Sequence, residues 1–273
     1  MTMEDRQQLL TAVATIAENA GQRIMEIYED GFEVWHKVDD SPLTAADQAS
    51  HQVIAQALSQ ITPNIPLLSE EGRIPDFSER RQWQRYWLID PLDGTKEFIN
   101  RNGEFTVNIA LIEAGAPVLG VVYAPARSTN WYAAAGVGAF RRVVGQAEQP
   151  IATRAAAQPM VVLASRSHRN DAVNALLDRL ETPEVLGIGS SLKFCLVADG
   201  SADFYPRFGP TSEWDTAAAH CVVEQAGGAV VNLDFEPLRY NSKESLLNPD
   251  FLVFGDPHHD WSTLLEGLHG ESR

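Results

Sequence analysis

The sequence predicts an α/β (α+β) protein built of layered sheets and helices. A helix pair opens the chain, a run of strands completes the first half, and strands alternate with helices in the second half, an order typical of layered folds. The 273 residues suffice for one large domain or two tightly packed halves. The polar stretch from Gly145 to Pro159 is the best internal boundary. We therefore expect an α+β half over residues 1–145, with a mixed or antiparallel sheet, and a smaller alternating half over 146–273, in one compact unit.

Two helices are predicted at the start of the chain. Over residues 3–30, apolar side chains recur at near 3.6-residue spacing, from Leu9 to Ile27, as in an amphipathic helix. Thr44 is a suitable N-cap for a second helix that runs to about Leu58.

The remaining elements follow from apolar runs of strand or helix character. In the first half, strands are expected at 32–38, 106–113, 116–124, 129–135 and 138–142. In the second half, strands are expected at 161–165, 203–206, 229–232 and 251–255, and helices at 169–181, 190–199 and 213–226. No internal repeat or low-complexity segment interrupts this order.

Composition restricts the classes of partner. The net charge of −16, from 21 basic and 37 acidic residues, disfavours polynucleotides and anionic lipid, so we expect a small-molecule partner. No apolar run has the length of a membrane span, and the polar first ten residues do not resemble a signal peptide. Cys195 and Cys221 lack metal-ligand spacing and are interpreted as buried free thiols of a cytoplasmic protein.

The most informative segment is the run from residue 87 to residue 98. An apolar stretch, interpreted as a buried strand, ends at Asp90, turns through Pro91 and Gly94, and presents Asp93 within the turn. Thr95 is then expected to open a helix as its N-cap. Hard oxygen ligands beside backbone N–H groups at a helix start are suited to a metal ion and a phosphate. The alternative interpretation of this run in isolation is a surface turn.

Further acids are candidates for the same site, although each also has a structural explanation. Glu70 ends an apolar segment, as acids at the rim of a cleft do, and otherwise belongs to a solvated loop. Asp47 after Thr44 and Asp215 after Ser212 have the spacing of helix capping boxes. Bound divalent cations would reconcile such an acidic chain with a phosphate substrate.

Three motifs together resemble a known family. Residues 68–71 (LSEE), 90–95 (DPLDGT) and 214–218 (WDTAA) match, in order and spacing, the inositol monophosphatase superfamily of lithium-sensitive, magnesium-dependent phosphatases. The resemblance spans roughly residues 37–228 and implies a layered αβαβα sugar-phosphatase fold. Within the superfamily the chain is similar to bacterial 3'(2'),5'-bisphosphate nucleotidases, on the segments at 96–98 (KEF), 165–168 (SRSH), 189–194 (GSSLKF) and 205–207 (YPR).

The resemblance implies roles for particular residues. Two or three Mg²⁺ ions would be held by Glu70, Asp90, the Leu92 carbonyl, Asp93 and Asp215. Glu70 and Thr95 would position the attacking water, with Asp47 accepting the Thr95 hydroxyl proton. The substrate would lie against Leu92, Asp93, Gly94, Thr95 and Asp215, with Gly94 and Thr95 offering backbone N–H groups to the phosphate. A second anion would be held by Ser190, Lys193 and Arg207, and the nucleotide would contact His168.

The expected reaction is hydrolysis of the 3'-phosphate of adenosine 3',5'-bisphosphate to AMP and phosphate, with the 3'-phosphosulfate analogue as a second substrate. The alternatives are an inositol-phosphate phosphatase and a non-catalytic metal- or phosphate-binding regulator. A phosphotransferase is disfavoured, because no P-loop glycine cradle occurs. The resemblance adds loose attachment to the cytoplasmic face of the inner membrane, although no basic amphipathic segment requires it. The oligomeric state stays open.

Overall fold

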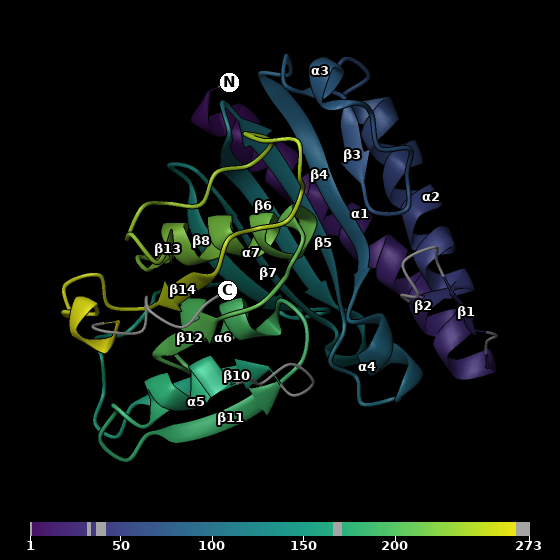
Figure 1. The fold of residues 1–273 in the computed structure, drawn as a ribbon. Coiled ribbons are helices and arrows are strands. Elements are labelled where there is room, and N and C mark those ends of the chain that lie inside the picture. The colour runs from purple at the N-terminus through teal and green to yellow at the C-terminus, as the bar shows by residue number, and fades with distance from the viewer. Residues whose placement is uncertain (1, 32–33, 37–41, 166–170, 266–273) are drawn as a thin grey trace.

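The computed structural model describes residues 2–31, 34–36, 42–165 and 171–265 and shows five stacked layers. Helices α1 (Met3–Asp30) and α2 (Ala45–Ile61) cover one face of a seven-stranded sheet (Figure 1). Helices α6 (Leu192–Ala198) and α7 (Glu213–Gln225) lie between this sheet and a five-stranded one. Helix α5 (Asp171–Leu177) packs on the outer face of the second sheet. The αβαβα layering expected from the sequence is confirmed.

The large sheet has the order β3-β4-β5-β6-β7-β8-β9. Its strands are β3 (Leu67–Ser69), β4 (Arg85–Asp93), β5 (Thr106–Glu113), β6 (Ala116–Ala124), β7 (Thr129–Ala134), β8 (Gly138–Val143) and β9 (Gln149–Pro150). β3 and β4 pair in parallel and the other neighbours antiparallel. β5 and β6 have the predicted bounds, because the two residues between them, Ala114 and Gly115, both have positive φ and close a tight hairpin.

The small sheet has the order β11-β10-β12-β14-β13 and is mixed. It consists of β10 (Val161–Ser165), β11 (Glu184–Ile188), β12 (Phe204–Arg207), β13 (Ala229–Asn232) and β14 (Phe251–Phe254). β10 pairs in parallel with β11 and β12, whereas β14 pairs antiparallel with β12 and β13. β11 was not predicted. It is a short strand with an internal glycine, Gly187, and three of its five residues are exposed.

Smaller elements join these layers. They are β1 (Val34–His36), β2 (Pro42–Thr44), α3 (Phe77–Arg80), α4 (Thr95–Ile99), η1 (Pro125–Arg127) and η2 (Ser262–Leu264). The change from the large sheet to the small one falls between β9 and β10, so β9 extends the first sheet past residue 145. α5 is shorter than the helix expected over 169–181.

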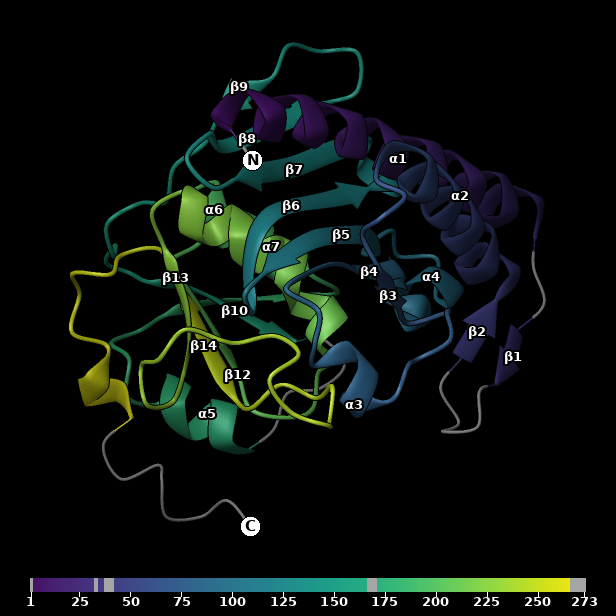
Figure 2. The same cartoon turned by 90° about the horizontal axis from the view of Figure 1, so that it is seen from above.

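Helix α7 lies very close to the large sheet. An ideal Cβ placed on Gly120 of β6 would lie 2.1 Å from the Ala218 carbonyl oxygen, so only glycine permits this approach. Figure 2 shows α7 running beneath β5 and β6, with the smaller sheet on its other side. The packing fixes the position of the first turn of α7, which carries Asp215.

Cys195 and Cys221 are buried free thiols, as predicted. Among the helices of the described residues, none is long and apolar enough to cross a membrane.

Candidate active site

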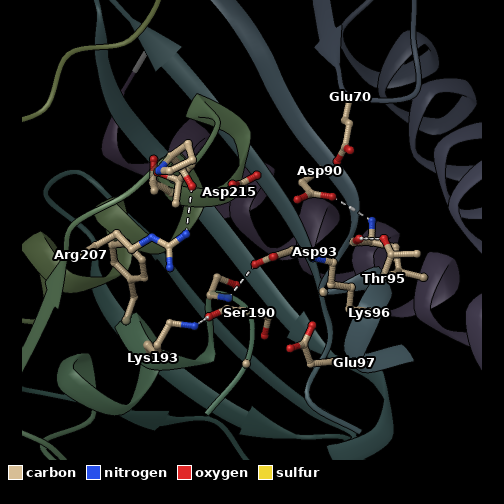
Figure 3. A pocket seen from close by; sticks show the side chains of 18 of the residues that line it. Glu70, Asp90, Asp93, Thr95, Lys96, Glu97, Ser190, Lys193, Arg207 and Asp215 are labelled. Atoms are coloured by element: carbon tan, nitrogen blue, oxygen red, sulfur yellow. Dashed lines mark hydrogen bonds between the residues drawn. The ribbon is translucent and has the colours of Figure 1, made fainter. Parts of the chain in front are cut away.

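One cavity collects most of the candidate residues at the point where β4 ends beside α4, α6 and α7. Its volume is about 300 Å³. Its lining includes Glu70, Asp90, Leu92, Asp93, Gly94, Thr95, Ser190, Lys193, Arg207 and Asp215. It also includes residues for which no site role was predicted from the sequence, among them Lys96, Glu97 and Ser191. Figure 3 shows the carboxylates of Glu70, Asp90 and Asp215 pointing towards one another from three different elements.

The end of β4 shapes the centre of the cavity. The pairing of β4 with β5 is irregular between Asp90 and Asp93, and the Leu92 N–H donates to Asp90 Oδ1 over 3.0 Å. Gly94 has φ +94° and is the N-cap of α4, which makes Thr95 the first helical residue. The expectation that Thr95 is the N-cap is therefore wrong. Glycine takes this place because the left-handed conformation strains any other residue.

Asp93 is held by hydrogen bonds from residues distant in sequence. Its Oδ2 accepts from the Ser191 N–H over 2.6 Å and from Asn108 Nδ2 over 3.3 Å. Burial raises the pKa of Asp93, although nearby Lys193 and these hydrogen bonds oppose the increase. No site role was predicted for Ser191 or Asn108 from the sequence. The only signal of Asn108 was a lone amide in an otherwise apolar strand.

Asp90 and Asp215 are carboxylates in the buried part of the cavity, where neighbouring acids repel them. Burial raises the pKa of Asp90 well above its ordinary value, and the charges of Glu70, Asp93 and Asp215 add to the increase. The pKa of Asp215 is raised in the same way, first by burial and then by Asp93. Such a cluster is costly as bare anions, and opposite charge in the cavity would stabilise its ionised form.

The ligand set fits magnesium. Carboxylates and the Leu92 carbonyl are hard oxygen donors, and Mg²⁺ typically takes one or two carboxylates while keeping waters and binding phosphate. Within the described part of the chain, no three His, Cys, Asp or Glu side chains meet closely enough to hold an ion by themselves. Ions held here would complete their coordination with water and phosphate oxygens.

Asp47 and Thr95 form the expected pair beside the candidate metal ligands. Thr95 Oγ1 donates to Asp47 Oδ1 over 3.2 Å. The other carboxylate oxygen, Oδ2, accepts from the Thr44 backbone N–H and hydroxyl, both over 2.7 Å, in a helix-capping arrangement. Burial raises the pKa of Asp47 to about 6. A group with that pKa can accept a proton near neutral pH.

Lys193 is buried rather than a surface lysine. Its Nζ donates to the carbonyl oxygens of Ser190 over 2.6 Å and Ile188 over 3.3 Å, which holds the loop before α6. Burial lowers its pKa to about 8. Ser190 has φ +49° and does not open the helix as expected, because α6 begins at Leu192 with Ser191 as N-cap.

Arg207 is the second buried cation of the cavity. It is 8% exposed, and its Nη2 donates to the Pro210 carbonyl over 2.9 Å. Its Nε is buried and has no hydrogen-bond partner among the described residues. His168 lies outside the described residues.

The chain is similar to known proteins of one family. The model of the inositol monophosphatase family matches residues 5–266. The 3'(2'),5'-bisphosphate nucleotidase CysQ of Salmonella typhimurium is 53% identical over 247 residues, 90% of this chain and 99% of that protein. The protein of the same name from Haemophilus influenzae is 38% identical over 262 residues, 95% and 97% of the two chains. The crystal structure of CysQ from Bacteroides thetaiotaomicron has a TM-score of 0.81 at 41% identity, and the match covers 92% of this chain and 97% of that one. By sequence and by structure, this chain belongs to the inositol monophosphatase family.

Proposed function

We propose that this protein is a Mg²⁺-dependent 3'(2'),5'-bisphosphate nucleotidase that removes the 3'-phosphate of adenosine 3',5'-bisphosphate. The observation that carries the proposal is the cavity in which Glu70 after β3, Asp90 and Asp93 of β4, and Asp215 of α7 come together. The bacterial nucleotidases named above support the substrate class, because they match this chain over nearly their full length. The 3'-phosphosulfate analogue is the expected second substrate.

Glu70, Asp90, the Leu92 carbonyl, Asp93 and Asp215 would hold two or three Mg²⁺ ions. When bound, the ions supply Lewis-acid polarisation of the phosphate and lower the pKa of water. The raised pKa values of Asp90 and Asp215 support this assignment, since their ionised forms need opposite charge in the cavity.

Thr95, Asp47 and Glu70 would position the attacking water. Because the Thr95 hydroxyl donates its proton to Asp47, its lone pairs face outward to receive a proton from water. The water oxygen would form a bond to phosphorus as the bond to the ribose 3'-oxygen breaks. The water proton would pass to the Thr95 hydroxyl, which gives its own proton to Asp47, and the leaving oxygen would take a proton from solvent water as the hydroxyl of AMP. Gly94 and Thr95 N–H groups would bind the non-bridging phosphate oxygens. The pair formed by Thr95 and Asp47 also favours an enzyme over a non-catalytic regulator, because binding alone needs no water-positioning residues.

The second phosphate would lie beside Arg207, with Ser190, Lys193 and His168 completing the nucleotide site. Arg207 supports this role through its buried, unpartnered Nε on the cavity wall. Lys193 contributes its charge and holds the carbonyl of Ser190. An Arg207→Ala variant should lose far more turnover on the bisphosphate than on 3'-AMP, which lacks the 5'-phosphate. Equal losses on both would contradict a second-phosphate role.

The proposed function is tested by phosphate release from adenosine 3',5'-bisphosphate, 3'-AMP and inositol 1-phosphate under matched conditions. We expect the bisphosphate to have the highest kcat/KM, by about tenfold or more, because the second anion contributes binding energy. EDTA should abolish turnover, and Li⁺ should inhibit it as in the family. Preferred turnover of inositol 1-phosphate would overturn the nucleotidase assignment, and activity that survives EDTA would overturn metal dependence.

A further inference from the structure

A second cavity lies on another part of the large sheet. It forms between the end of α3, the start of β4, the β5–β6 hairpin and the loop that follows Leu238. Its volume is about 510 Å³, within the range of small-molecule sites. The lining residues are Arg81, Trp83, Gln84, Tyr86, Ala114, Gly115, Arg239, Tyr240, Asn241 and Ser242. None of them lines the candidate active site.

The walls of this cavity are held together by hydrogen bonds between distant segments. The Ala114 N–H donates to the Gln84 carbonyl over 2.9 Å, and the Tyr240 N–H donates to the Gly115 carbonyl over 3.1 Å. Asn241 Nδ2 donates to the Arg80 carbonyl over 2.6 Å. The cavity is therefore formed by the fold itself and needs no rearrangement to receive a ligand.

Two exposed arginines give the cavity a positive lining. In the part of the chain that the structure describes, neither Arg81 nor Arg239 forms a salt bridge or a side-chain hydrogen bond. Behind them, Arg80 is buried and donates to three neutral oxygens, those of Asn241, Lys243 and Glu244. Unpaired cations are unexpected in a chain of net charge −16, and a guanidinium pair is suited to a phosphate group.

Buried acid behind the wall offsets only part of this charge. Glu213 lies in the interior, where burial raises its pKa to about 7, and Lys243 Nζ lies 3.9 Å from its Oε1. Glu224 is a second acid within electrostatic range, because the charge of Arg239 contributes to lowering its pKa, but neither acid lines the cavity, where both charged side chains are arginines.

An aromatic wall stands beside the arginines. Trp83 is half-buried, and its ring centroid lies 5.8 Å from that of buried Tyr86, at an interplanar angle of 47°. The Tyr86 hydroxyl is buried and has no hydrogen-bond partner among the described residues. An indole that is partly open to the cavity can stack on a planar ligand, and nucleobases stack on aromatic side chains with about 1–3 kcal/mol.

We propose that this cavity is a binding site for a nucleoside monophosphate, with the phosphate between Arg81 and Arg239 and the base against Trp83. The guanidinium pair recognises the dianion, and the indole selects ligands that carry a ring. Because its lining has two arginines and no carboxylate, the site would bind its ligand without metal. The inference therefore stands apart from the proposed reaction.

The test is a calorimetric titration of 5'-AMP into EDTA-treated protein carrying Arg207→Ala, which removes the cation proposed to hold the 5'-phosphate in the other cavity. This background is compared with the same protein carrying Arg81→Ala and Arg239→Ala together, and with a matched control, Arg127→Ala, which removes an exposed arginine elsewhere. The double substitution should raise Kd by about tenfold or more, because two charge-assisted contacts are lost. Arg127→Ala should leave Kd within about twofold. Circular dichroism checks that every variant is folded.

A second set of titrations tests whether the base stacks on Trp83. Ribose 5-phosphate should bind about tenfold more weakly than 5'-AMP, and Trp83→Ala should remove that difference, because the base then loses its stacking partner. No saturable heat up to about 5 mM 5'-AMP, a range that detects millimolar affinity, would overturn the proposal. Binding that survives the double arginine substitution would also overturn it, and equal affinity for the two ligands would refute the role of Trp83.

Discussion

Asp47 serves both a helix and the active site, because its two carboxylate oxygens have separate partners. Oδ2 caps α2 through Thr44, and Oδ1 accepts the hydrogen bond from Thr95. Asp215 is arranged in a similar way, since its Oδ2 accepts from the Ser212 N–H over 2.8 Å while its side chain lines the cavity. The structural and the functional explanations of these acids are therefore compatible. The cap fixes the side-chain rotamer and so aims the second oxygen.

The Thr95 hydroxyl is open to a direct test. Thr95→Val keeps the shape of the side chain but removes the hydroxyl that would receive the proton of the attacking water. We expect kcat to fall by about 10²–10³-fold, the range for loss of a positioned proton-transfer group, with little change in KM. Thr95→Ser should restore most of the activity. A Val variant with near-normal kcat would contradict the role.

Substitution of Asp90 by asparagine should stabilise the metal-free protein and lower Mg²⁺-dependent activity. Because its folded-state pKa is raised, the ionised carboxylate destabilises the metal-free fold once the pH exceeds the unfolded value of about 3.9. Asp90→Asn can still accept from the Leu92 N–H, and it removes the repulsion from Glu70. We expect Mg²⁺-dependent turnover to fall by about 10²-fold or more.

The same variant should melt a few degrees higher than wild type in EDTA at neutral pH, and the difference should shrink towards pH 4. Thermal unfolding at both pH values measures it. A lower melting temperature at pH 7 would contradict the repulsion argument.

At the scale of elements, α7 brings Asp215 to the site by packing against β6. Gly120 makes this contact possible, because a Cβ there would overlap the Ala218 carbonyl and approach Cys221 Cβ to 2.9 Å. The first turn of α7 then lies beside the end of β4, which carries Asp90 and Asp93. A glycine in β6 thus determines the position of Asp215, a candidate metal ligand on α7.

Gly120→Ala should displace α7. We expect the free energy of unfolding to fall by about 1–3 kcal/mol, the range for an overpacked core. The Mg²⁺ concentration that gives half-maximal activity should rise. Gly187→Ala is the matched control, since nothing lies within 4 Å of its ideal Cβ. Denaturant unfolding and Mg²⁺ titration of activity measure both effects. Unchanged stability in Gly120→Ala would show that the helix shifts without cost.

At the scale of the whole molecule, the junction between the two sheets depends on a buried acid. Arg154, in the connection between β9 and β10, donates to both oxygens of Asp203 over 2.8 and 2.7 Å. The Val161 N–H also donates to Asp203, over 2.7 Å. Burial raises the pKa of Asp203, but these hydrogen bonds outweigh it and the net pKa is lowered.

This junction predicts a pH dependence of stability. A lowered folded-state pKa stabilises the fold above the unfolded value of about 3.9, and this contribution is lost as the pH falls from there through the folded value. Asp203→Asn should lower the free energy of unfolding at pH 7 by about 2 kcal/mol and should flatten its fall below pH 4. Asp76→Asn, an exposed aspartate without a side-chain cap bond, is the control. Parallel pH profiles for Asp203→Asn and wild type would contradict the assignment.

Most of the elements could be predicted from the sequence, because periodicity and turn residues are local. The strands at Thr106–Glu113 and Ala116–Ala124 matched their predicted bounds, and α1 began and ended as expected. Two helix starts were placed wrongly. Gly94 is the N-cap of α4 where Thr95 was expected, and α6 begins at Leu192 although its helix was expected to begin at Ser190. Both errors lie beside left-handed residues, where the chain conformation depends on contacts outside the segment.

The sequence by itself determined the layered fold, the family motifs and the set of acids that they contain. Only the tertiary structure decided which atoms meet: Ser191 and Asn108 on Asp93, Thr95 on Asp47, and the Lys193 ammonium on the carbonyls of its own loop. Asp93 and Ser191 are 98 residues apart, and their contact depends on the packing of α6 against the large sheet. Local propensities determine helices and strands, whereas hydrogen bonds between distant segments form only once the layers have packed.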